Sequence, residues 1–293
     1  MQKALILIFS LASLCGCSTL AHKQEEPSNS LILAEPLAVP FQSEVELARL
    51  EEILSRADLN NDQRAQVFYR RGVVYDSVGL KALARRDFNR AVQLKPDMAD
   101  AYNFIGIQAI SAEEFEQAYE ALDAAIELDP KHEYAYLNRG IALYYGDRPE
   151  LAVKDLETFL SMQPSDPYRI LWLYLAEQKA DPAAAKARLA YNATRLQGDL
   201  WANQLVALYQ GKESEEDFVE GLKKGVDSNR ALAERLCEAY FYLGKLHQAK
   251  GDVGEAINFF KLSLTTNVQD FIEFRYARLE LNRMRRELSH KAG

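Results

Sequence analysis

The chain has 293 residues, of which 48% are hydrophobic and 27% are charged. It contains only 14 glycines and 9 prolines, a composition typical of a mostly helical protein. The net charge of −8 argues against nucleic acid as a partner, because affinity for nucleic acid depends on neutralising phosphates.

The first sixteen residues are organised like a bacterial secretion signal. Lys3 supplies a positive charge, and an apolar run follows from Ala4 to Leu14. This run is shorter than the roughly 20 apolar residues of a membrane-spanning helix, so it favours a cleavable signal peptide over residues 1–16. The run ends in the letters LCGC, which resemble a lipobox and predict that Cys17 carries a lipid. The alternative is an ordinary secretory signal in which Cys17 is incidental.

The residue after the lipid anchor and the cysteine content bear on location. Ser18 stands where lipoproteins retained in the inner membrane usually have Asp, so we expect anchoring in the outer membrane, facing the periplasm. Signal cleavage removes Cys15 and acylation occupies Cys17, which leaves Cys237 as the one thiol of the mature chain and excludes an intramolecular disulfide. The Ala- and Leu-rich surroundings of Cys237 predict a buried packing residue rather than a nucleophile.

A tether and a helix are expected before the repeats. Residues 17–42 hold the lipidated cysteine, several prolines and many polar residues, as in a spacer, although two apolar patches interrupt them. Ser43 and Glu46 form a capping-box pattern, so we expect a helix to begin there within an N-terminal helical region over 43–62.

A 34-residue period governs residues 63–166 and predicts three tetratricopeptide (TPR) repeats. Gly on the first helix and Ala on the second allow the two helices of a hairpin to cross closely, and Pro ends the second helix. Gly79 supplies the first turn, whereas Glu113 and Asp147 hold the equivalent places in less ideal turns. The recurring residues are Gly72, Gly106 and Gly140; Ala84, Ala118 and Ala152; and Pro96, Pro130 and Pro164.

The repeat signature weakens and then returns in the second half. A fourth TPR repeat is predicted over 237–270, and residues 167–236 are expected to form TPR-like helices at about 167–179, 183–196, 199–210 and 214–225. A final helix at about 270–288 should cap the stack, and the C-terminal capping helix and tail are assigned to 271–293. The predicted fold class is all-α: a TPR helical-hairpin solenoid with degenerate repeats.

A search for catalytic or metal-binding residues finds none. His132 opens a sequence like the HExxH zinc motif, but Tyr136 occupies the place of the second ligand. The stretch from Gly211 lacks the hydroxyl and the earlier glycine of a P-loop. We therefore predict that the protein is not an enzyme and takes no cofactor and no metal.

TPR arrays bind partners on a concave surface formed by the first helix of each repeat. An aromatic and aliphatic groove with scattered polar groups suits apolar peptide segments or helices. Some of these side chains could instead pack against neighbouring repeats. The candidate groove residues are Tyr69, Val73, Asp76, Asn103, Ile107, Ile110, Tyr134, Leu137, Ile141 and Tyr144.

Several stretches resemble one group of proteins more closely than the repeat pattern requires. They are 71–77 with 82–85, 96–98, 137–146 (LNRGIALYYG), 171–179 (LWLYLAEQK), 242–245 and 275–277. Through these residues the chain resembles the NlpI-like family of enterobacterial outer-membrane lipoproteins. The resemblance spans roughly residues 35–282 and is loosest over 181–236.

This resemblance implies a homodimeric, non-catalytic adaptor in the periplasm. NlpI-like proteins bring a murein endopeptidase to the tail-specific protease Prc for degradation and bind several peptidoglycan hydrolases, which implies effects on cell-wall growth and division. The alternative functions are those of TPR lipoproteins that assist outer-membrane β-barrel assembly or pilus secretin assembly.

Overall fold

The computed structural model describes residues 31–56 and 58–292 and divides the chain into two units, Met1–Ile32 and Leu33–Gly293. The signal peptide and Cys17 lie outside the described residues. The described residues form helices and contain no strand, which confirms the predicted fold class. The helices are α1 Phe41–Ser55, α2 Asn61–Ser77, α3 Lys81–Leu94, α4 Ala99–Ser111, α5 Phe115–Leu128, α6 Glu133–Tyr145, α7 Pro149–Met162, α8 Pro167–Ala180, α9 Pro182–Ala193, α10 Ala202–Tyr209, α11 Glu215–Gly221, α12 Asn229–Lys250, α13 Val253–Thr265 and α14 Ile272–Ala292.

Glycine allows the two helices of each predicted TPR hairpin to pack closely against each other. A Cβ on Gly106 of α4 would lie only 2.5 Å from Cγ of Leu122 on α5. A Cβ on Gly72 would likewise come too close to the Phe88 ring, and a Cβ on Gly244 would come too close to the Phe260 ring. Because no side chain fits at these contacts, glycine on the first helix lets the second helix pack directly against it.

The turns inside the first three hairpins have the expected irregularity. Gly79 adopts a φ of 81°, in the left-handed region that glycine enters without strain. Glu113 and Asp147 occupy the equivalent turns with φ angles of 60° and 61°. These two turns are therefore less ideal, as predicted, because a side chain raises the energy of that conformation.

The degenerate region contains the four expected helices, and the last two are shorter than predicted. Prolines at the first turn of α8 and α9 follow Asp166 and Asp181, whose carboxylates accept backbone N–H groups of the helix starts. Capping and proline together explain why both boundaries could be predicted. The helix that carries the start of the predicted fourth repeat is longer than the repeat, because α12 starts at Asn229 after the cap Ser228 rather than at 237.

The N-terminal segment differs from the predicted tether in two ways. Residues 33–40 are not a free spacer: Leu37 donates its backbone N–H to the Thr266 carbonyl at 2.9 Å, and the Asn229 side chain pairs with the backbone of Glu35. Helix α1 also begins at Phe41 rather than Ser43, and no side chain caps it. Pro40 precedes the helix with its φ fixed at −63°, so the chain enters α1 without the capping box.

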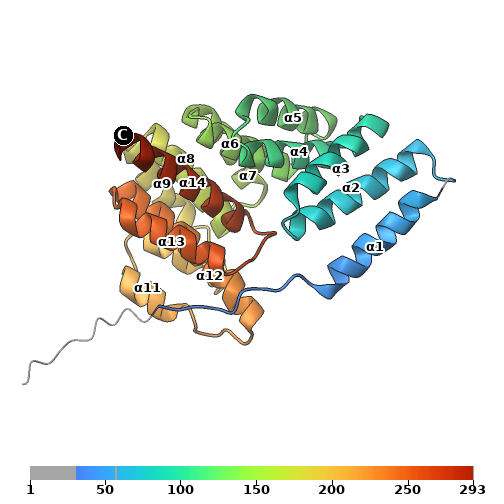
Figure 1. Ribbon diagram of the computed structural model, residues 1–293. Coiled ribbons are helices and arrows are strands. Elements are labelled where there is room, and N and C mark those ends of the chain that lie inside the picture. The colour runs from blue at the N-terminus through green and yellow to red at the C-terminus, as the bar shows by residue number, and fades with distance from the viewer. Residues whose placement is uncertain (1–30, 57, 293) are drawn as a thin grey trace, which may run out of the picture. The chain divides into compact units, whose positions relative to one another are not determined.

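Helix α14 does more than cap the last repeat. It packs beside α12 and α13, as a cap would (Figure 1). Another part of the helix reaches the first repeats: Arg283 donates to the Tyr145 carbonyl at 2.9 Å, and the Tyr276 and Tyr145 rings lie 5.3 Å apart. Helix α14 therefore covers the last repeat and also lies against the first three, because buried polar and aromatic contacts hold it against α2, α4 and α6.

No helix in the described ranges is both long and apolar enough to cross a membrane.

Candidate functional site

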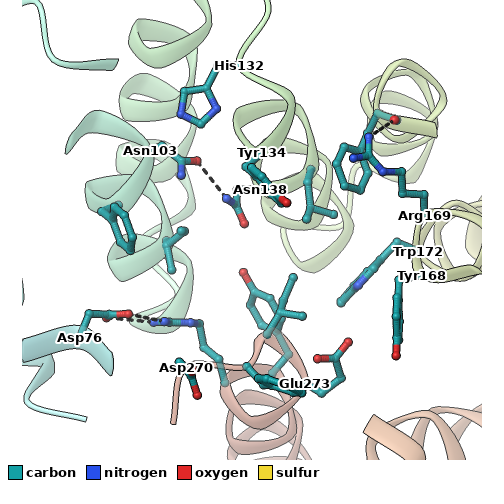
Figure 2. Close-up of a pocket in the computed structure, with 18 of the residues that line it drawn as sticks. Asp76, Asn103, His132, Tyr134, Asn138, Tyr168, Arg169, Trp172, Asp270 and Glu273 are labelled. Atoms are coloured by element: carbon teal, nitrogen blue, oxygen red, sulfur yellow. Dashed lines mark hydrogen bonds and ion pairs between the residues drawn. The ribbon is translucent and has the colours of Figure 1, made fainter. Parts of the chain in front are cut away.

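The first helices of the hairpins surround a cavity of about 600 Å³, here called the groove pocket. Helices α2, α4, α6, α8 and α12 each contribute to its wall, and the start of α14 closes it (Figure 2). The pocket is therefore the concave surface expected of a TPR array, narrowed by the C-terminal helix.

Helix α6 supplies the most accessible aromatic side chain of the pocket. Tyr134 is 54% exposed although it is a large hydrophobic residue. One turn further along, Leu137 is buried, and Asn138 donates to Asn103 of α4 at 2.9 Å. This wall thus offers an apolar surface beside a pair of carboxamides, which suits a peptide backbone with apolar side chains.

The arginine on α8 is already neutralised inside the protein. Arg169 is 3% exposed, donates to Glu133 at 2.6 Å and to the Phe159 carbonyl at 2.7 Å, and stacks its guanidinium 3.9 Å from the Phe159 ring centre. Because these partners satisfy its charge, Arg169 positions the pocket wall rather than attracting an anion.

The Asp76 carboxylate on α2 is likewise committed within the protein. Arg275 of α14, Lys81 and Gln108 all donate to it. Burial opposes ionisation of Asp76, but Arg275 and Lys81 outweigh it, so the pKa of Asp76 lies below its usual value. Asp76 lines the pocket, and its charge holds α14 in place.

A second group of carboxyls, at the opposite end of the pocket, has no such cation. Glu273 of α14 is 3% exposed, and Glu238 of α12 is half-buried. Burial raises the pKa of Glu273 to about 7; burial and the neighbouring Glu273 raise the pKa of Glu238 well above its usual value. Two carboxyls that share a poorly hydrated region favour a bound proton or a bound cation.

Six of the ten predicted groove residues line the pocket and four do not. Ile110 and Ile141 are fully buried in the core, and Tyr144 is only 5% exposed and packs edge-on against Trp172. Tyr69 packs against the Phe88 and Phe104 rings. These four side chains pack within the array and support the repeats. The lining residues are Val73, Asp76, Asn103, Ile107, Tyr134 and Leu137.

Most pocket residues of the second half of the chain could not be predicted from the repeat pattern. Tyr168 and Trp172 of α8, Glu238 of α12 and the start of α14 all reach the pocket. Trp172 lies in LWLYLAEQK, which falls outside the repeat signature, and Arg275 and Tyr276 lie in the stretch 275–277; both stretches are singled out by the resemblance. The other residues come from elements whose approach to the first repeats depends on how the whole array curves.

His132 has a structural role in this arrangement. Its Nδ1 accepts the Ala135 N–H at 3.2 Å and caps α6, while its Nε2 lies 3.1 Å from Asp100. Across the described part of the chain, no group of three or more His, Cys, Asp or Glu side chains could hold a metal ion.

Cys237 is buried, as predicted. Its side chain is fully covered, and its Sγ lies 3.6 Å from the Ser263 hydroxyl. Burial raises the pKa of the Cys237 thiol to about 12, which keeps it protonated and unreactive.

Comparison with known proteins identifies the repeats. Two tetratricopeptide-repeat family models match this chain, one over residues 105–190 and one over 65–98. Residues 65–98 and 105–190 therefore contain tetratricopeptide repeats, a fold that typically serves as a non-catalytic scaffold for protein–protein interaction.

One solved structure with a TM-score of 0.50 agrees on the fold, and others of lower score are also similar. The chain is similar to the Cut9–Hcn1 tetramer of the APC/C, with 19% identity, 83% of this chain and 46% of that chain covered, and a TM-score of 0.50. It also resembles YrrB, described as a TPR protein with an unusual peptide-binding site (14% identity, 82% and 100% covered, TM-score 0.43). A third is pilF of Pseudomonas aeruginosa (16% identity, 82% and 90% covered, TM-score 0.46). At these identities the likeness concerns the fold alone.

Proposed function

We propose that this TPR protein is a non-catalytic adaptor that holds a peptide segment of a client protein in the groove pocket. The observation that carries the proposal is the pocket itself: five first helices and α14 surround about 600 Å³ and leave Tyr134 exposed at its wall. A cavity of this size accommodates several side chains of an extended or helical segment.

The chemistry of the pocket favours a peptide over a small metabolite. Apolar side chains such as Val73, Ile107 and Leu137 alternate with the Asn103 and Asn138 carboxamides. A peptide offers the same alternation, because each residue carries apolar side-chain atoms next to backbone donors and acceptors.

The resemblance to NlpI-like lipoproteins supplies the proposed partners. The client would be a peptidoglycan hydrolase, in particular a murein endopeptidase, and the second partner the tail-specific protease Prc. Holding both on one scaffold raises their effective concentration towards the millimolar range and speeds degradation without any chemistry by the adaptor. Controlled removal of a hydrolase would in turn affect cell-wall growth and division.

The location follows from the proposed anchor. Lipid chains on Cys17 would hold the protein on the periplasmic face of the outer membrane, since each buried CH₂ contributes about 0.8 kcal/mol and one chain alone binds weakly. Replacing Cys17 with Ala should leave an unacylated precursor. Labelled palmitate in that variant would contradict the anchor.

Helix α1 supports the proposed homodimer. It packs mainly against α2, and Phe41 and Val45 are 73% and 52% exposed. Exposed apolar side chains on one short segment favour a symmetric contact with a second copy. Sedimentation of residues 18–293 should give about twice the monomer mass, and Val45→Glu should reduce it towards the monomer. A wild-type monomer at micromolar concentration would contradict the dimer.

Two exposed tyrosines, one in the pocket and one outside it, test the binding proposal. Tyr134→Ser should weaken hydrolase binding about tenfold by calorimetry, because Tyr134 is exposed in the pocket and its loss leaves the core intact. Tyr191→Ser is the matched control: Tyr191 is 66% exposed on α9, away from the pocket. If both variants bind the hydrolase with equal affinity, the binding site lies elsewhere on the protein. Capture of β-barrel assembly proteins or a secretin in place of the hydrolases would favour the alternative functions.

A further inference from the structure

One end of the groove pocket is a polar recess formed by Tyr168, Trp172, Glu238, Glu273 and Tyr276. Figure 2 shows Trp172 and Tyr168 beside Glu273, at the end of the pocket away from Asp76 and His132. The Trp172 and Tyr276 rings lie 5.7 Å apart, edge to face. Three elements distant in the sequence, α8, α12 and α14, thus meet at this recess.

The recess holds two carboxyl groups that no positively charged side chain of the described residues neutralises. No lysine, arginine or histidine of the described chain forms an ion pair with Glu238 or Glu273. The two arginines that line the pocket are engaged elsewhere, Arg169 with Glu133 and Arg275 with Asp76. A cation that enters the recess therefore meets carboxyls without competition from the protein's own side chains.

The recess also holds polar atoms that lack a partner. Trp172 is 2% exposed and Tyr276 is fully buried, and neither the Trp172 Nε1–H nor the Tyr276 hydroxyl has a hydrogen-bond partner in the described structure. In Figure 2 the Trp172 indole is directed into the pocket. A buried N–H without an acceptor is unfavourable and is expected to be satisfied by a ligand.

A ligand for this recess must therefore neutralise the carboxyls and also accept a hydrogen bond from the Trp172 N–H. A metal ion or a polyamine would neutralise the carboxyls but could not accept the Trp172 N–H. A peptide residue with a basic side chain does both, because its cation meets Glu238 and Glu273 while a backbone carbonyl accepts from Trp172.

We propose that this recess binds an arginine or lysine side chain of the client segment and so selects clients with a basic residue beside an apolar stretch. The inference rests on the proposed peptide-binding function and specifies its partner. Tyr168 and Glu238, both half-buried, form the entrance through which the side chain passes, and Glu273 lies at the closed end.

The test uses a probe that requires no partner protein. Full-length protein with ¹⁵N-labelled tryptophan gives two indole signals, because the chain contains only two tryptophans, and Trp201→Phe assigns that of Trp172. Titration with N-acetyl-arginine methylamide should move the Trp172 signal in a saturable way. The citrulline analogue has nearly the same shape but no charge, and it should bind at least tenfold more weakly.

The variants separate the recess from general electrostatics. Glu273→Gln and Glu238→Gln should each lower the affinity for the arginine probe at least fivefold. Glu120→Gln, on the exposed face of α5, removes the same charge elsewhere and should leave the affinity within twofold. A citrulline probe that binds as well as the arginine probe, or an unmoved Trp172 signal, would overturn the inference.

A second measurement distinguishes failure of this inference from failure of the proposed function. Hydrolase binding that falls with Tyr134→Ser but is unchanged by Glu238→Gln and Glu273→Gln would overturn the basic-residue recess and leave the adaptor function standing. Loss of hydrolase binding in all three variants, together with arginine-probe binding by the wild type, supports both.

Discussion

Asp76 of α2 and Arg275 of α14 form an ion pair of 2.7 Å although 199 residues separate them in the sequence. Both side chains are nearly buried, at 6% and 9% exposure. The pair fastens the C-terminal helix to the first repeat and so fixes the width of the groove pocket between them. A TPR array without such a helix would leave this surface open.

Removing the arginine of this pair should loosen α14. We expect Arg275→Met to lower the free energy of unfolding by about 2–3 kcal/mol, because the buried Asp76 would keep only Lys81 and Gln108 as partners. Urea denaturation and amide exchange over α14 measure the effect. Arg285→Met, at an exposed position of the same helix, is the control and should change neither the free energy of unfolding nor the amide exchange over α14. Unaltered exchange in Arg275→Met would show that other contacts hold the helix.

The glycine contacts predict a sharp difference between two conservative substitutions. Gly106→Ala should destabilise the protein by about 1–2 kcal/mol, since the new Cβ meets buried Leu122 at 2.5 Å and overpacking exceeds the gain in helix propensity. Gly254→Ala on α13 has no atom within 4 Å of the new Cβ and should be neutral or slightly stabilising. Thermal denaturation measures the difference, and equal melting temperatures of Gly106→Ala and Gly254→Ala would contradict the packing argument.

A buried ion pair joins α12 to α14. Lys245 and Glu280, 3% and 4% exposed, pair with each other and with Gln248. Lys245→Met alone should cost about 3–5 kcal/mol, because it leaves the Glu280 charge buried and unpaired. The double variant Lys245→Met with Glu280→Met should recover most of that loss. A double variant as unstable as the single one would mean that packing rather than charge dominates.

The raised pKa of Glu273, to about 7, predicts how stability depends on pH. The unfolded chain loses this proton near the ordinary value of 4.5, whereas the folded chain keeps it until about pH 7. Between these values the folded state binds more protons, so the free energy of unfolding falls as the pH rises, by an amount on the order of 3 kcal/mol. Glu238, Tyr168 and Tyr242 face Glu273, and none of them supplies a compensating positive charge.

Glu273→Gln should remove most of this slope. The variant should gain stability relative to the wild type at pH 8 and differ little from it at pH 5. Denaturant unfolding at both pH values measures the difference, with Glu120→Gln as the control. A wild-type stability that rises from pH 5 to pH 8 by several kcal/mol would contradict the buried, unpaired state of Glu273.

The repeat part of this fold could be predicted because its determinants are local. Gly106 and Leu122 lie in one hairpin, and the 34-residue period repeats their relationship along the chain. The path of α14 could not be predicted in this way. Arg275 is one of several arginines on that helix, and only the curvature of the assembled hairpins brings it to Asp76 rather than to solvent.

The same distinction applies to the pocket. Val73, Asn103 and Leu137 could be placed on the concave face, because they follow the repeat period. Tyr144 and Ile141 follow the same period but are buried, since α8 and α14 cover the later repeats. For this reason Tyr134 alone, rather than Tyr134 with Tyr144, is the substitution that tests binding without disturbing the core.

The most direct test of the adaptor account is a reconstituted degradation assay with the murein endopeptidase and the tail-specific protease. The wild-type chain should raise the rate of endopeptidase degradation at least tenfold over protease alone, and should cleave nothing when the protease is left out. Tyr134→Ser should lose most of the acceleration, and Tyr191→Ser should retain it. Equal degradation rates with and without the chain, or cleavage of the endopeptidase by the chain alone, would contradict the account.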